Sequence, residues 1–322
     1  MPTSPTATCP QAQGPCFEVE GRRLRLHRAG AGGPAVVFLP GAGLVGLDYL
    51  NVHEAVARFT TSVLYDRGGT GWSDPVPLPR TAADVAGELR RLLRAADIAP
   101  PFVLVGHSLG GAYARRFAQL FPDETAGLVF LDPAHEGYAS MPKPSLLAQA
   151  RMGLAMIPAA LDMKRFYRPL FERMLAAWPQ DARQSLIDYH LRNWRKSIQE
   201  AANLQGEVLG EIGEGGAVPD VPLVVLTAMG IDPFQAAFLA KDYLRDLNAK
   251  KRTFYDAFAA SSPRGQNRTV DAGHSTLHTD RPGAVVDAIR DVVTAARRER
   301  PAPGPALASG GATAKLAACT GS

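Results

Sequence analysis

Short apolar runs alternate along most of the chain with longer segments in which apolar residues recur every three or four positions. The short runs predict strands at 35–40, 61–66, 102–106, 127–132, 222–227 and 268–273. The first five are nearly continuous in apolar residues, which is typical of strands buried on both faces of a parallel sheet. The longer segments predict helices at 81–96, 110–121, 235–250 and 283–298. This alternation predicts a doubly wound, mostly parallel α/β sheet.

Two segments depart from the alternation. Residues 16–30 have the pattern of a hairpin that turns at Glu20–Gly21, which predicts an antiparallel edge of the sheet. Residues 134–216 contain three amphipathic helical patterns and no convincing strand. Because this segment is too long and too apolar for a plain loop, we expect a helical cap inserted before the penultimate strand.

The two ends of the chain have a different composition from the rest. Residues 1–16 are rich in Pro, Thr and Gln, and residues 300–322 are rich in Pro, Gly and Ala, so both are predicted to be disordered tails. The α/β core then comprises residues 17–133 and 217–299. The N-terminal segment lacks the basic and apolar regions of a signal peptide, and no apolar stretch is long enough to cross a membrane. We therefore expect a cytoplasmic protein with no membrane partner.

Composition narrows the class of protein only slightly. Apolar residues make up 46% and charged residues 20% of the chain, as in ordinary globular proteins. The 35 basic and 31 acidic residues are mixed along the sequence, so we expect no nucleic-acid partner. The three cysteines, Cys9, Cys16 and Cys319, lie in the terminal segments and have neither disulfide-framework nor metal-site spacing. Neither a metal nor an organic cofactor is expected, and the sequence indicates no oligomeric state.

Ser108 lies where the predicted strand 102–106 becomes a helix. It is flanked by Gly106 and Gly110 in a Gly-x-Ser-x-Gly pentapeptide. On such a strand–turn–helix the serine backbone is strained, which small neighbours tolerate, and its hydroxyl is lifted toward the N-terminus of the following helix. The sequence therefore predicts that Ser108 is a nucleophile rather than an ordinary turn residue.

A serine hydroxyl needs a base, and the base needs an orienting carboxylate. His274 follows the last predicted strand, so it comes after the serine and the acid in chain order; His278 is the fallback. Asp232 and Asp132 each lie just past a strand end. We prefer Asp232 as the acid and keep Asp132 as the alternative.

The oxyanion that forms when a carbonyl is attacked needs backbone N–H donors. One is the amide of Leu109, at the start of the helix after Ser108. The second is the amide of Ala42, in the glycine-rich loop that follows the predicted strand 35–40. Ala42 and Leu109 are therefore the predicted oxyanion hole.

Four motifs of this chain resemble those of the α/β-hydrolase superfamily, in the family's order. They are "FLPGAG" for the oxyanion loop, with Pro40 in place of the usual histidine, "YDRGGTGWSD" after the fourth strand, "GHSLGG" for the nucleophile elbow and "GHSTLHTDRP" for the histidine loop. The resemblance covers residues 20–295. The spacing before Asp232 is slightly longer than in common members, and Asp132 occupies the position that some relatives use for the acid, so both aspartates stay open.

The resemblance implies a serine hydrolase that cleaves a carboxylic ester or lactone of an apolar small molecule through an acyl-enzyme on Ser108. Epoxide hydrolases and haloalkane dehalogenases share this scaffold but use an aspartate nucleophile, which this chain lacks at position 108. A thioesterase, C–C hydrolase or cyclase on the same scaffold is the alternative. A non-catalytic ligand-binding protein is the third hypothesis, and an intact set of serine, histidine and acid speaks against it.

Overall fold

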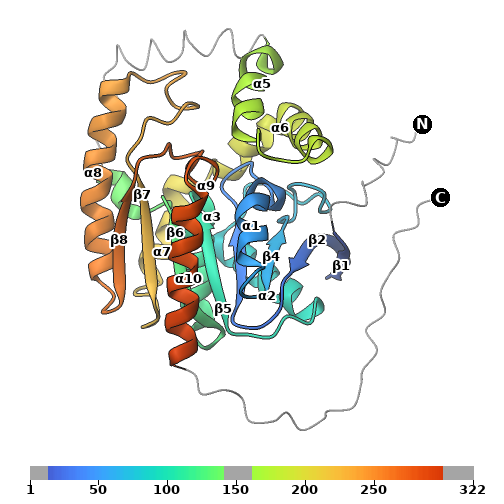
Figure 1. The fold of residues 1–322 in the computed structure, drawn as a ribbon, viewed down its shortest axis with the longest axis vertical. Helices are drawn as coiled ribbons and strands as arrows, with labels where there is room; N and C mark the ends of the chain where they lie inside the picture. The colour runs from blue at the N-terminus through green and yellow to red at the C-terminus, as the bar shows by residue number, and fades with distance from the viewer. Residues whose placement is uncertain (1–13, 141–161, 300–322) are drawn as a thin grey trace, which may run out of the picture.

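The computed structural model describes residues 14–140 and 162–299, and its centre is a single eight-stranded sheet (Figure 1). The spatial order of the strands is β1-β2-β4-β3-β5-β6-β7-β8. The pairs β1–β2 and β2–β4 are antiparallel, and all the others are parallel. The strands are β1 (Cys16–Val19), β2 (Arg22–Ala29), β3 (Ala35–Leu39), β4 (Ser62–Tyr65), β5 (Phe102–His107), β6 (Thr125–Leu131), β7 (Leu223–Ala228) and β8 (Gly265–Val270). The predicted mostly parallel α/β sheet is confirmed.

Helices cover both faces of this sheet and form two separate apolar cores (Figure 1). Helices α2, α3 and α8 pack on one face, and α1 and α10 pack on the other. The α-helices are α1 (Leu50–Val56), α2 (Ala82–Ala95), α3 (Leu109–Leu120), α5 (Met163–Met174), α6 (Gln180–Ala201), α7 (Leu209–Glu214), α8 (Lys241–Ala260), α9 (Leu277–Asp280) and α10 (Pro282–Arg298). Shorter helical turns are η2 (Gly46–Tyr49), η3 (Pro122–Glu124), η4 (Glu136–Ser140) and η5 (Leu204–Val208). The parallel strands β3, β5 and β6 are buried throughout, which is why their sequences lack polar alternation.

Helices α5 and α6 stand over the carboxyl ends of the parallel strands, between β6 and β7 in the chain (Figure 1). They match two of the three helices predicted for the cap. The third predicted helix, within 145–161, lies outside the described residues. The predicted tails also lie outside them, except for residues 14–16, of which Cys16 begins β1. In residues 14–140 and 162–299 no helix is both long and apolar enough to cross a membrane.

Two elements near the C-terminus lie away from their predicted positions. Helix α8 begins at Lys241 rather than at residue 235, because residues 232–239 form turns instead. The Asp232 carboxylate opens these turns by accepting the backbone N–H of Gln235 at 2.8 Å. Strand β8 lies three residues earlier than predicted, because this half-exposed edge strand is built from polar residues that carry no apolar signal.

Candidate active site

Ser108 occupies the turn between β5 and α3 with strained backbone angles, φ 50° and ψ −122°. The strain persists because neighbouring backbone fits closely around it. A Cβ on Gly110 would lie 2.0 Å from the carbonyl oxygen of Leu39, and one on Gly106 would lie 2.7 Å from the carbonyl oxygen of Gly110. No larger residue fits at these two positions, so the two glycines of the pentapeptide are required by packing.

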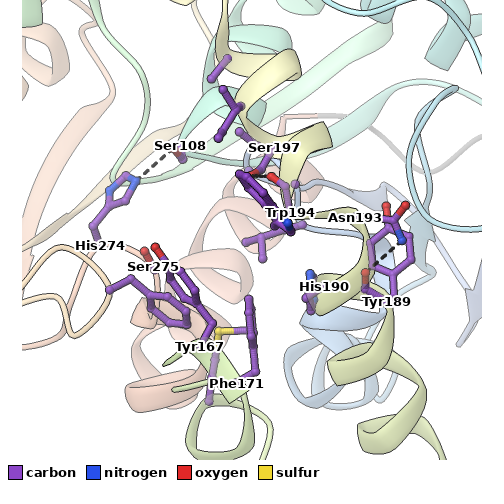
Figure 2. Close-up of a pocket in the computed structure, with 18 of the residues that line it drawn as sticks. Ser108, Tyr167, Phe171, Tyr189, His190, Asn193, Trp194, Ser197, His274 and Ser275 are labelled. Carbon is purple, nitrogen blue, oxygen red and sulfur yellow. Dashed lines mark hydrogen bonds between the residues drawn. The ribbon is translucent and has the colours of Figure 1, made fainter. Parts of the chain in front are cut away.

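His274 and Asp132 lie beside Ser108 in one hydrogen-bonded series. The Ser108 hydroxyl is 3.0 Å from His274 Nε2, a hydrogen bond that Figure 2 marks with a dashed line. His274 Nδ1 is 2.6 Å from Asp132 Oδ2. Asp132 Oδ1 accepts the backbone N–H of Ala228 at 3.0 Å, which anchors the carboxylate to the end of β7. The arrangement can move the serine proton to His274 while Asp132 balances the resulting charge.

The preference for Asp232 as the partner of His274 is wrong, and the alternative, Asp132, lies there. Asp232 Oδ2 instead accepts the backbone N–H of Ser275, and its Oδ1 accepts that of Gln235. Both oxygens are therefore used to shape loops. The fallback base, His278, is buried in α9 and stacks on Tyr49 with ring centroids 4.4 Å apart, so it does not take the place of His274.

Lys251 is a member of this cluster that the sequence did not single out. Its ammonium lies 2.9 Å from Asp132 Oδ2, and both side chains are buried. Burial alone would raise the pKa of Asp132, but the Lys251 charge and the hydrogen bond from His274 outweigh it and lower the pKa to about 2. Asp132 is therefore ionised across the physiological pH range.

His107 links the loop after β3 to the loop that carries His274. The Gly41 N–H donates to the Tyr49 hydroxyl, which in turn donates to His107 Nδ1 at 2.6 Å. This leaves the proton of the neutral ring on Nε2, which donates to the His274 carbonyl oxygen at 2.8 Å. Burial, with the neighbouring His274, lowers the pKa of His107 to about 4 and keeps the ring neutral in that role.

The predicted oxyanion amides belong to the helix that follows Ser108 and to the loop after β3. Leu109 is the first residue of α3, where a backbone N–H has no partner within the helix. The loop that carries Ala42 lies against the serine, because a Cβ on Gly41 would come within 3.3 Å of the Ser108 Cβ. Ala42 and Ser108 border the same cavity. Donation by these two amides to a bound oxygen stays a prediction.

A buried ion pair between Arg67 of the core and Glu200 of the cap holds this loop in place. The Arg67 guanidinium donates to the carbonyl oxygens of Pro40 and Gly41 at 2.6 and 3.0 Å. It also donates to Oε1 of Glu200, on cap helix α6, at 2.9 Å. The second oxygen of Glu200 accepts the Gly43 N–H at 2.7 Å. Residues 40–43 are therefore fixed jointly by the core and by the cap.

Replacing Glu200 by glutamine is expected to destabilise the protein by about 3 kcal/mol, because it leaves the Arg67 cation buried without its counter-charge. Chemical denaturation of the variant and the wild type measures the difference. The matched control is Glu214→Gln, an exposed position at the end of α7, for which we expect a change below about 0.5 kcal/mol. Equal stabilities of the two variants would contradict the role given to this pair.

An apolar cavity of about 740 Å³ opens beside Ser108 and His274. Figure 2 shows Tyr167 and Phe171 of α5 on one side of it and Trp194 and Ser197 of α6 on another. Its large apolar lining residues include Tyr167, Phe171, Trp194, Ile198, Phe234 and Phe238. A smaller cavity of about 210 Å³ also borders Ser108 and His274. In the described ranges no group of three or more His, Cys, Asp or Glu is arranged to hold a metal ion.

The chain belongs to the α/β hydrolase family, whose model matches residues 36–288. Among relatives in sequence, the uncharacterised protein YqjL of Bacillus subtilis (strain 168) is 35% identical over 112 residues, which span 34% of this chain and 43% of YqjL. The match to YbdG of the same organism covers 38% of that protein. The chain thus spans about two fifths of the length of these curated relatives.

Solved structures of the same fold cover nearly all of the described core. An esterase from Thermogutta terrifontis has a TM-score of 0.55 and 19% identity, with 87% of this chain and 98% of that chain covered. The epoxide hydrolase CorEH has a TM-score of 0.65 and 18% identity, with 87% and 97% covered. At these identities the likeness shows the fold, and the reaction has to be argued from the side chains around Ser108.

Proposed function

We propose that the protein is a serine hydrolase that cleaves a carboxylic ester or lactone of an apolar substrate through an acyl-enzyme on Ser108. The observation that carries this proposal is the series of hydrogen bonds from Ser108 through His274 to Asp132. A binding protein has no need for a strained serine joined to a base and a buried carboxylate. The chain carries serine at the elbow, which separates it from aspartate-dependent members of this fold.

The first half of the reaction forms the acyl-enzyme. Ser108 Oγ attacks the carbonyl carbon, and its proton passes to His274 Nε2. The negative charge on the former carbonyl oxygen is stabilised by the N–H groups of Ala42 and Leu109. When the tetrahedral intermediate collapses, His274 gives its proton to the leaving oxygen, and the alcohol departs.

The second half releases the acid. His274 removes a proton from a water molecule, and the resulting hydroxide attacks the acyl carbon. When the second tetrahedral intermediate collapses, the bond to Ser108 Oγ breaks, His274 gives its proton to Oγ, and the acid departs. Throughout, Asp132 holds His274 by its Nδ1–H and balances the charge of the imidazolium. No step requires a group from outside the chain except water.

The lining of the larger cavity supports an apolar substrate. Aromatic side chains from α5, α6 and the segment after β7 surround the approach to Ser108. Each CH₂ group that the substrate buries against them contributes about 0.8 kcal/mol. We therefore expect a clear dependence of kcat/KM on acyl chain length, at least tenfold between the best and the worst ester of a series.

Hydrolysis of p-nitrophenyl esters from acetate to dodecanoate tests the reaction, and labelling with a fluorophosphonate followed by peptide mass spectrometry tests the nucleophile. We expect turnover with an optimum chain length, and a single label on Ser108. Labelling without turnover of any ester would favour a thioesterase, C–C hydrolase or cyclase that uses the same groups. Absence of both would contradict the proposal.

A further inference from the structure

Lys251 contacts the carboxylate oxygen that also holds the imidazole. Its side chain is 4% exposed, and its Nζ lies 2.9 Å from Asp132 Oδ2. The same oxygen lies 2.6 Å from His274 Nδ1. Nζ also donates to Asn248 Oδ1 at 3.0 Å, and Asn248 Nδ2 donates to the Gly230 carbonyl oxygen at 2.9 Å. The ammonium is thus held in place from its own helix, α8, and from the end of β7.

Asp132 does not need Lys251 in order to have a hydrogen-bond donor at each of its oxygens. The carboxylate already accepts from the Ala228 N–H and from His274, one bond on each oxygen. A buried ion pair is weak evidence for stability, because removing two charges from water offsets much of their attraction. Placing a cation there does change the electrostatics of His274. The carboxylate stabilises the imidazolium, and the ammonium beside it opposes that stabilisation.

We propose that Lys251 is a positioning residue whose buried positive charge sets the pH range over which His274 acts as a base. The inference rests on the proposed function, since it concerns the base of that reaction. With the ammonium present, the neutral imidazole that accepts the Ser108 proton is favoured down to lower pH. Without it, Asp132 acts on His274 unopposed, and the imidazole is protonated at higher pH.

The other ionisable groups around His274 keep one charge state across the range concerned. Asp132 is ionised, because its pKa is lowered to about 2. His107, from β5, is neutral, because burial lowers its pKa to about 4, and burial likewise keeps His278 of α9 neutral. Tyr138, after β6, is half-buried, and loss of contact with water raises the pKa of its hydroxyl well above the usual value. Asp232, in the loop after β7, accepts the backbone N–H groups of Ser275 and Gln235.

The test is the rate at which a fluorophosphonate labels Ser108, measured from about pH 5 to 9 on the full chain, a range in which His107 stays mostly neutral. This readout follows the base without requiring the natural substrate. The variants are Lys251→Met, which removes charge and donor, and Lys251→Gln, which removes the charge and keeps a donor. We expect the acid limb of the rate profile to move upward by about one pH unit in both. Lys250→Met, the neighbouring exposed position, is the control and should leave the limb in place.

Each outcome decides the inference. A purely structural lysine would lower the labelling rate at every pH without moving the limb, and glutamine would restore it, which would overturn the proposal. Failure of both uncharged variants to fold, judged by circular dichroism and thermal melting, would also assign Lys251 to stability and overturn it. A wild type that the reagent does not label would refute the proposed function first. A labelled wild type with unmoved variants would refute only the role of Lys251.

Discussion

Alanine at position 108 is expected to lower kcat/KM for the best p-nitrophenyl ester by a factor of about 10⁴ or more. The hydroxyl is the only part of the side chain that alanine lacks, and it is the atom that forms the acyl bond. The strained turn remains satisfied, because its geometry depends on Gly106 and Gly110 rather than on the hydroxyl. The melting temperature should therefore stay close to that of the wild type. Residual turnover at the level expected from the cavity and the amides alone would fit the proposed mechanism.

The control for this variant is Ser261→Ala. Ser261 is exposed at the end of α8, and its hydroxyl donates to the Phe258 carbonyl oxygen. We expect its kcat/KM to lie within about twofold of the wild type, since surface substitutions away from the site have small effects. If Ser108→Ala keeps a tenth or more of the wild-type activity after active-site titration, another residue is the nucleophile.

Asparagine at position 132 is expected to lower kcat/KM by about 10³ to 10⁴, because an amide in place of the carboxylate holds the wrong tautomer of His274. The substitution also leaves the Lys251 ammonium buried without a counter-charge, so we expect a loss of about 3 kcal/mol of unfolding free energy. Ester kinetics at saturating and limiting substrate, with denaturation curves for the same preparation, separate these two effects.

The matched comparison is Asp232→Asn, which makes the same chemical change at the end of the neighbouring strand β7. In the wild type the two Asp232 oxygens accept the backbone N–H groups of Gln235 and Ser275. Asparagine has one side-chain oxygen and can keep one of these hydrogen bonds. One lost hydrogen bond is worth about 1 kcal/mol, so the expected loss of kcat/KM is below about tenfold. A larger loss at Asp232 than at Asp132 would reverse the assignment of the acid.

Ser108 and His274 could be singled out from the sequence because each lies next to a local signal for a turn or a strand end. Ser108 lies between two glycines at a strand end, and His274 follows the last predicted strand. The acid could not be decided in this way. Asp132 and Asp232 follow adjacent strands, β6 and β7, and both precede the histidine in chain order. The two carboxylates accept hydrogen bonds from different backbone N–H groups. These contacts depend on tertiary packing, so the sequence does not show which carboxylate is left to bind His274.

Lys251 and Glu200 were missed for a related reason. Both are charged residues in amphipathic helices, where the ordinary expectation is a solvated face. Lys250 and Lys251 are adjacent, and only the helical phase decides that the first is exposed and the second buried. The position of each side chain around the helix depends on where α8 begins. It begins at Lys241, later than the apolar pattern predicts, because the turns that start at Asp232 take up the preceding residues. The strands β3, β4, β5, β6 and β7, by contrast, were predictable, because their continuous apolar runs report burial on both faces directly.

The contacts of Glu200 with Arg67 and with the Gly43 N–H join cap helix α6 to the loop 40–43, so the two are expected to move together. A motion that lifted α6 away from the core would release the Gly43 N–H and remove the counter-charge of Arg67. The loop would then lose its fixed shape at the moment the cavity opened. Opening by that route would therefore disturb the loop that carries the proposed oxyanion donor. Changes of specificity in this protein are expected to arise by exchanging side chains of α5 and α6 that line the cavity, while the contact between Glu200 and Arg67 is kept.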